Sequence, residues 1–97
     1  MTREEHLLTI VAEECAEVAQ RATKALRFGL TDPKGTQEGE LSNKKRLLQE
    51  YGDLMAVMKM LFSKELDYIP STDYQKKKVD RIEKFLILSK EIGKLDG

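Results

Sequence analysis

The sequence predicts an all-α protomer of three helices, with a long first helix, a loop, a second helix and a third helix. Apolar residues recur at intervals of three and four in three stretches, and no stretch alternates as a strand would. Proline and glycine separate the stretches. The chain has 97 residues, which suits one domain over residues 1–97 with a small core of its own. We therefore expect an oligomeric helical bundle that completes the core.

The first helix is predicted over residues 2–28. Thr2 and Glu5 form a capping-box pattern, in which the hydroxyl bonds a backbone amide and the carboxylate reaches back. Gly29 supplies a stop, because glycine readily adopts the conformation that ends a helix. The apolar stripe expected to face the core consists of Leu7, Leu8, Val11, Cys15, Val18, Ala19, Ala22 and Leu26.

The second helix is predicted from a cap at Ser42 to about residue 64, after a loop at 30–41 whose role stays open. Val57 and Met60 widen its apolar surface, so we expect two partners to cover this helix. Its main stripe consists of Leu47, Leu48, Tyr51, Leu54, Met55, Met58, Leu61 and Phe62.

The third helix is predicted over about residues 73–92, because Pro70 disfavours helix before it and Gly93 ends the pattern. The lysine run at 76–78 opens this helix, where positive charge is unfavourable to the helix dipole. A solvated face is the more economical reading of that run, and its role stays open. The apolar stripe consists of Val79, Ile82, Phe85, Leu86, Leu88 and Ile92.

Charge and cysteine content exclude several classes of protein. Seventeen basic and seventeen acidic residues cancel, so no global field draws in a nucleic-acid polymer or an anionic membrane. Cys15 is the one cysteine, which rules out an intrachain disulfide and a thiolate zinc site, and its position in the stripe predicts a core residue. There is no signal-peptide pattern at the start and no apolar run of about 20 residues, so we expect a soluble cytoplasmic protein.

Two acidic pairs occupy equivalent positions on the first two helices. Glu14 and Glu17 are three residues apart, as are Glu50 and Asp53, and each pair flanks its own apolar stripe. Glu13 falls on the far side of its helix. If the two helices pack antiparallel, the four carboxylates come close and repel one another unless a cation lies among them. Carboxylate oxygens are preferred by Mg²⁺, although a single such pair is more often plain surface charge.

Basic residues continue the carboxylate line on the first helix. Arg21 and Lys24 follow Glu17 by four and seven residues, so they lie on one face. Helical ion pairs worth a few tenths of a kcal/mol (about 0.2 to 0.5) explain each cation alone. A row of cations beside a metal is also what a polyphosphate needs.

The acidic motifs and their surroundings resemble a known family. Glu-Glu-Cys-Ala-Glu-Val at 13–18 and Glu-Tyr-Gly-Asp-Leu at 50–54 resemble the paired motifs of the MazG-like, all-α nucleoside triphosphate pyrophosphohydrolases. The string at 24–29 and the Asn43 region resemble short phage-type members.

The resemblance implies hydrolysis of an NTP or dNTP to the monophosphate and pyrophosphate, by homodimers or homotetramers with Mg²⁺ or Mn²⁺. It implies that the metal is held by Glu14, Glu17, Glu50 and Asp53. A water bound to the metal would attack phosphorus, with Glu14 or Glu17 taking its proton; the sequence does not choose between them. Lys24 and Arg27 are the expected phosphate contacts, and Asn43 a further contact to substrate. Arg21 has the better helical phase but no clear counterpart in the family.

Two alternatives stay open. In one, the chain is a non-catalytic helical interaction or regulatory module, and the acidic pairs are surface charge. In the other, the enzyme is a pyrophosphohydrolase of a nucleotide with a modified base, a nucleotide-sugar or a phosphoribosyl compound. Dependence of pyrophosphate release on Mg²⁺ separates the first alternative from the enzyme, and a substrate panel separates the second.

Overall fold

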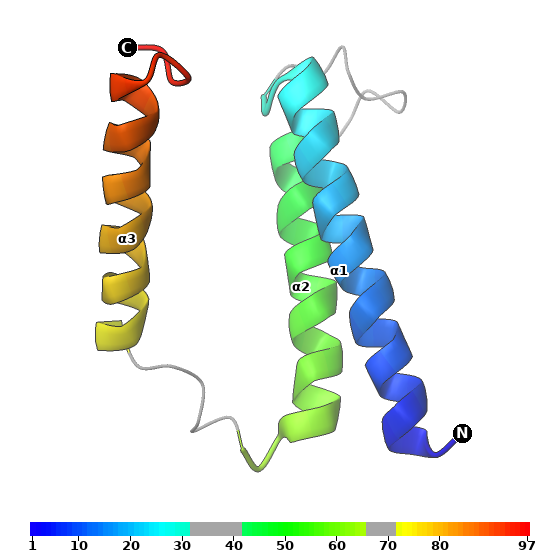
Figure 1. Ribbon diagram of the computed structural model, residues 1–97. Helices are drawn as coiled ribbons and strands as arrows, with labels where there is room; N and C mark the ends of the chain where they lie inside the picture. Colours follow the sequence, from blue (N-terminus) through cyan, green and yellow to red (C-terminus); the bar gives the residue numbers. More distant parts are fainter. Residues whose placement is uncertain (32–41, 66–71) are drawn as a thin grey trace. The chain divides into compact units, whose positions relative to one another are not determined.

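The computed structural model describes residues 1–31, 42–65 and 72–97, and within them it is all-α (Figure 1). The helices are α1 (Arg3–Phe28), α2 (Asn43–Phe62) and α3 (Thr72–Glu91), and these described parts contain no strand. The three-helix prediction is confirmed, with each boundary within about two residues of the expected one. Most of the predicted loop at 30–41, and Pro70, lie outside the described residues.

The chain divides into two compact units, Met1–Ser63 and Lys64–Gly97. The first holds α1 and α2, and the second holds α3. Each unit is described by itself, and the prediction of one domain over residues 1–97 stays a prediction. None of the described helices combines the length and the apolarity that crossing a lipid bilayer requires.

The first turn of α1 has the predicted capping box. The backbone N–H of Glu5 donates to the Thr2 hydroxyl at 3.0 Å, and the Thr2 N–H donates to the Glu5 carboxylate at 3.1 Å. These bonds satisfy two donors that a helix start otherwise leaves without partners. The bond from the Thr2 backbone, together with the one from its hydroxyl, lowers the pKa of Glu5.

The junction between α1 and α2 is held by backbone and amide hydrogen bonds. Gly29 ends α1 with φ of 90° and donates its N–H to the Ala25 carbonyl at 2.7 Å. The side-chain amide of Asn43 donates to the Gly29 carbonyl at 2.9 Å, and Asn43 is 1% exposed. Ser42 caps α2 by accepting from the N–H of Lys45 at 3.1 Å. This network sets which side of α2 faces α1.

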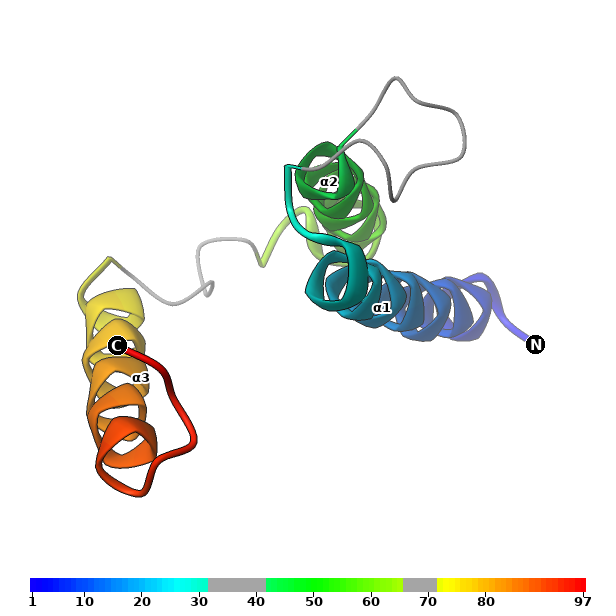
Figure 2. The same ribbon diagram turned by 90° about the horizontal axis from the view of Figure 1, so that it is seen from above.

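Helices α1 and α2 run antiparallel and lie side by side in both views (Figures 1 and 2). Their contact faces can be followed through buried and half-buried residues that recur at helical intervals. On α1 these include Leu7, Glu14, Arg21 and Ala25; on α2 they include Asn43, Arg46, Glu50 and Val57. Carboxylates and cations therefore lie in the interface itself, between apolar contacts.

This contact face corrects the predicted cores of the first two helices. Leu8, Cys15 and Leu26 were expected to face the core, yet all three are exposed, Leu26 by 86%. Tyr51 and Met55 of the α2 stripe are exposed as well. The physical reason is the junction: Asn43, held at Gly29, turns its own face of α2 toward α1. Much of both apolar stripes is thus left uncovered by the α1–α2 pair.

Helix α3 has no buried residue. Every residue of its predicted apolar stripe is exposed, with Phe85 at 60%. The expectation that an oligomer completes the core stays a prediction. Gly93 follows the helix with φ of 77°, and the Lys94 N–H donates to the Ser89 carbonyl at 2.7 Å, which closes the last turn as predicted. A helix of this length has little stability without packing of its apolar face.

Candidate metal centre

The two acidic pairs meet where α1 and α2 face each other. Glu14, Glu50 and Asp53 each offer one carboxylate oxygen, and these three oxygens lie within 4.8 Å of one another. Glu17 joins them through its contact with Glu50. The antiparallel arrangement explains the meeting, because residues near the middle of α1 then face the first half of α2. All four predicted carboxylates are therefore neighbours.

Burial differs within each acidic pair. Glu14 and Glu50 are half-buried in the helix interface, whereas Glu17 and Asp53 are exposed at its edge. The Oε2 atoms of Glu14 and Glu50 are buried and have no hydrogen-bond partner among residues 1–31, 42–65 and 72–97. A buried carboxylate oxygen without a donor costs free energy, so these two atoms call for a cation or a proton.

The negative charge of the cluster affects the pKa of one of its members, Glu17. A hydrogen bond with the Glu50 carboxyl group, followed by the negative charges of Glu50 and Glu14, raises the pKa of Glu17. Two carboxyl groups can share a hydrogen bond only when one of them carries a proton. Repulsion among the carboxylates of the cluster thus favours binding of a proton or a cation.

Arg21 contacts the cluster from α1. Its Nε lies 3.6 Å from Oε1 of Glu50, and the two side chains are 23% and 15% exposed. Arg46 is half-buried one turn before Glu50 on the same face of α2. Arg21 was a candidate by helical phase without being among the predicted site residues, and Arg46 was not predicted. The i, i+4 spacing of Arg46 to Glu50 is the signal that could have indicated it.

The three predicted substrate contacts lie in different surroundings. Lys24 is half-buried one turn beyond Arg21, on the carboxylate side of α1. Arg27 is exposed, its guanidinium lies 5.1 Å from the Phe28 ring centre, and its helical phase is about 140° from Glu14. The structure does not bring Arg27 to the cluster within one chain.

Asn43 has a structural role in this chain. Its amide nitrogen is bound to the Gly29 carbonyl and its side chain is almost completely buried. The predicted substrate contact at this position stays a prediction. The lysine run 76–78 is exposed on α3 and belongs to the second unit.

The residues present fit a hard divalent cation. All ligands offered are carboxylate oxygens, which Mg²⁺ prefers, and the only thiol, that of Cys15, is exposed away from the contact face. Two of the carboxylates contribute the buried oxygens that lack donors. Exposed Asp53 and Glu17 leave one side of the cluster open to solvent, where a cation could keep water or phosphate ligands.

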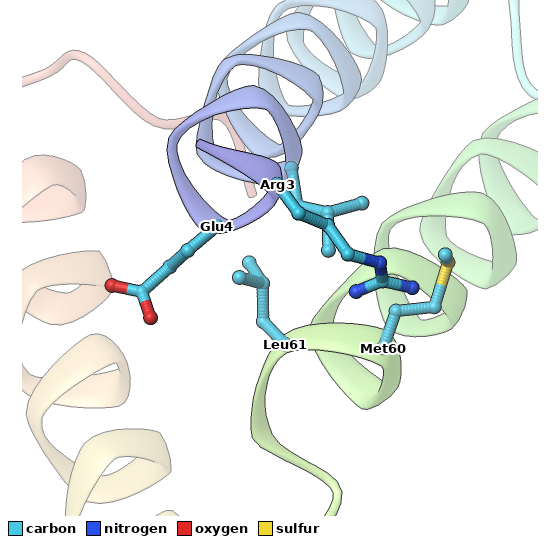
Figure 3. A pocket seen from close by; sticks show the side chains of 5 residues that line it. Arg3, Glu4, Met60 and Leu61 are labelled. Carbon is cyan, nitrogen blue, oxygen red and sulfur yellow. The ribbon is translucent and has the colours of Figure 1, made fainter. Parts of the chain in front are cut away.

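A hollow lies where the start of α1 meets the end of α2. Arg3, Glu4, Leu7, Met60 and Leu61 line it. Figure 3 shows the Arg3 guanidinium beside Met60 and the Glu4 carboxylate pointing away from both. Leu7 is seven residues, or about 10 Å along the helix, before Glu14, so this hollow is separate from the cluster.

Comparison of the chain with protein-family models, with curated proteins and with solved structures finds no match. The MazG-like family therefore stays a prediction that depends on the motifs and on the geometry of their carboxylates.

Proposed function

We propose that the chain is a Mg²⁺-dependent nucleotide pyrophosphohydrolase of the MazG-like kind, which converts an NTP or dNTP and water to the monophosphate and pyrophosphate. The observation that carries the proposal is the convergence of Glu14, Glu50 and Asp53 from two helices, with oxygens within 4.8 Å. The two buried oxygens without donors support a cation at that point. We place the reaction in the cytoplasm, and Mn²⁺ is the expected substitute metal.

The four carboxylates divide into two roles under this proposal. Glu14, Glu50 and Asp53 hold the cation, because their oxygens are mutually close. Glu17 is exposed at the edge of the cluster and touches Glu50, so it is the carboxylate placed to accept a proton from water arriving from solvent. The geometry thus favours Glu17 over Glu14 as the general base.

The reaction needs a water nucleophile and positive groups that neutralise the charge of the phosphates. A bound Mg²⁺ supplies a polarised phosphate and a more acidic water. In this scheme Glu17 takes a proton from the attacking water as the water oxygen bonds to the α-phosphorus. The bond between that phosphorus and the α–β bridging oxygen breaks, and pyrophosphate leaves with the bridging oxygen. Lys24, half-buried on the same side of α1, offers an ammonium group to phosphate oxygens.

Assembly into a homodimer or homotetramer belongs to the same proposal. The apolar residues left exposed on α1 and α2 include Leu8, Leu26, Leu48, Tyr51 and Met55. Exposed apolar side chains that recur at helical intervals on two neighbouring helices support an interface with a second copy. A partner copy would cover these stripes while leaving the carboxylate face between α1 and α2 in place.

The test is pyrophosphate release from a panel of ribo- and deoxynucleoside triphosphates with Mg²⁺ and with EDTA. We expect turnover of at least one nucleotide with Mg²⁺ and none with EDTA, and a loss of at least about a hundredfold in Glu50→Gln and Asp53→Asn with helix content unchanged. Glu13→Gln is the matched control, since Glu13 is exposed and one residue from the cluster. Its activity should stay within about twofold of the wild type.

The rival function is a helical interaction module without catalysis. The exposed stripe of α3 favours it, since such a surface suits a helical partner. No turnover of the panel, extended to modified nucleotides, nucleotide-sugars and phosphoribosyl nucleotides, with either Mg²⁺ or Mn²⁺ would overturn the enzyme in favour of this module. Turnover of only a modified or phosphoribosyl nucleotide would keep the enzyme and change its substrate.

A further inference from the structure

Arg21 is placed between the acidic cluster and the solvent side of α1. Its Nε lies 3.6 Å from Oε1 of Glu50, and the arginine side chain keeps 23% of its surface exposed. Glu50 is also one of the three residues whose oxygens converge. One carboxylate therefore serves both the arginine and the candidate cation site.

The second oxygen of Glu50 is in a different position. Oε2 is buried without a hydrogen-bond donor in the described part of the chain, whereas Oε1 faces Arg21. A divalent cation among Glu14, Glu50 and Asp53 would place two positive charges beside the guanidinium. Like charges at that range repel strongly in a half-buried setting, so the ion pair and the cation oppose each other.

We propose that Arg21 is an exchangeable counter-cation, which neutralises Glu50 in the metal-free protein and turns to phosphate oxygens of the substrate once a divalent cation holds Glu50. This inference rests on the proposed metal site. Arg21 is a specificity-determining residue in this scheme: it makes the site accept a metal together with a polyphosphate in preference to a metal alone.

Chemistry and helix geometry both suit this exchange. Arg21 and Lys24 are three residues apart and share one side of α1, so both cations can serve the same phosphate group. A guanidinium carries five donors in a planar fork and binds two phosphate oxygens at once. The arginine side chain keeps 23% of its surface exposed, so part of it already borders solvent, from which a phosphate would arrive.

The first test measures Mn²⁺ affinity by calorimetry on the full chain without nucleotide. Arg21→Gln removes the competing charge and should bind Mn²⁺ about three- to tenfold more tightly than the wild type. Arg21→Lys keeps the charge and should stay within about twofold of the wild type. Lys59→Gln is the matched control, because Lys59 is exposed and half a helical turn round α2 from Glu50; it should also stay within about twofold.

The second test measures binding of inorganic pyrophosphate at saturating Mn²⁺. Both Arg21→Gln and Arg21→Lys should weaken it about tenfold, since neither substitute offers a forked pair of donors. If Arg21→Gln fails to fold by circular dichroism, Arg21→Lys still decides, because unchanged pyrophosphate affinity in that variant contradicts the exchange.

The outcomes separate this inference from the proposed function. Equal or weaker Mn²⁺ binding by folded Arg21→Gln overturns the exchange, while a wild type that binds Mn²⁺ and releases pyrophosphate retains the enzyme. A wild type that binds Mn²⁺ neither alone nor together with pyrophosphate overturns both. Tighter Mn²⁺ binding with weaker pyrophosphate binding in Arg21→Gln supports the exchange.

Discussion

Replacing Glu14 with glutamine should stabilise the metal-free protein. The change keeps the shape of the side chain and removes one negative charge from a group whose oxygens lie within 4.8 Å of one another. It also introduces an amide donor into a cluster in which the buried Oε2 of Glu50 has no hydrogen-bond partner in the described residues. Most substitutions at half-buried positions destabilise, so a gain in stability is a distinctive result.

The magnitude follows from Coulomb's law and from exposure. Two unit charges 4.8 Å apart repel by about 0.9 kcal/mol at the dielectric of water and by about 3.5 kcal/mol at an effective value of 20. Glu14 and Glu50 are half-buried and Asp53 is exposed, so screening favours the lower part of this range. We expect Glu14→Gln to raise the free energy of unfolding in EDTA by about 1 to 2 kcal/mol.

The assay is urea unfolding followed by circular dichroism, in EDTA and in excess Mg²⁺. Mg²⁺ at about 100 times its dissociation constant should stabilise the wild type by about 2.7 kcal/mol, and Glu14→Gln should lose most of this gain. Glu13→Gln, which removes an exposed charge next in sequence, should behave as the wild type within about 0.5 kcal/mol in both buffers. A destabilised Glu14→Gln protein with an undiminished response to Mg²⁺ would refute the reasoning.

Three further results are expected. Because the pKa of Glu17 is raised in the folded state, its contribution to stability without metal should be fully present below the ordinary carboxyl pKa and be lost as pH rises through the raised one. Glu17→Gln should remove that part of the pH dependence in urea unfolding, and an unchanged profile would contradict the cause given. Ser42→Ala removes the α2 cap and should lower the free energy of unfolding by about 1 kcal/mol, whereas Ser42→Asp should not; equal losses would argue against capping. Val57→Ala, at a buried position, should destabilise by about 1 to 2 kcal/mol, while Met60→Ala, half exposed, should cost less than about 0.5; the reverse order in thermal unfolding would contradict the helix interface.

The boundaries of the helices were predictable from short sequence patterns. The Thr2 and Glu5 spacing placed the start of α1 because a capping box is complete within four residues, and Gly29 and Gly93 placed two helix ends for the same reason. The acidic pairs were matched from helical phase alone, and the structure brings all four carboxylates together. Each of these features depends on residues that are near in sequence or on one helical face.

The rotation of the helices about their own axes was not predictable in the same way. The apolar stripes suggested that Leu8 and Leu26 face α2, but the Asn43 to Gly29 bond turns another face inward. That bond joins residues 14 positions apart across the junction, and the spacing of apolar residues along the helices does not predict it. The pairing of Arg21 with Glu50 likewise crosses from one helix to the other, so helical phase gave Arg21 a suitable side without its partner.

The central claim is that the carboxylates contributed by α1 and α2 serve a metal-dependent pyrophosphohydrolase. Phosphorus NMR of the protein with Mg²⁺ and each nucleoside triphosphate identifies the bond that is cleaved. The account predicts equal amounts of nucleoside monophosphate and pyrophosphate from at least one nucleotide, abolished by EDTA and by Asp53→Asn. Formation of diphosphate and orthophosphate, or product that persists in Asp53→Asn, would contradict it.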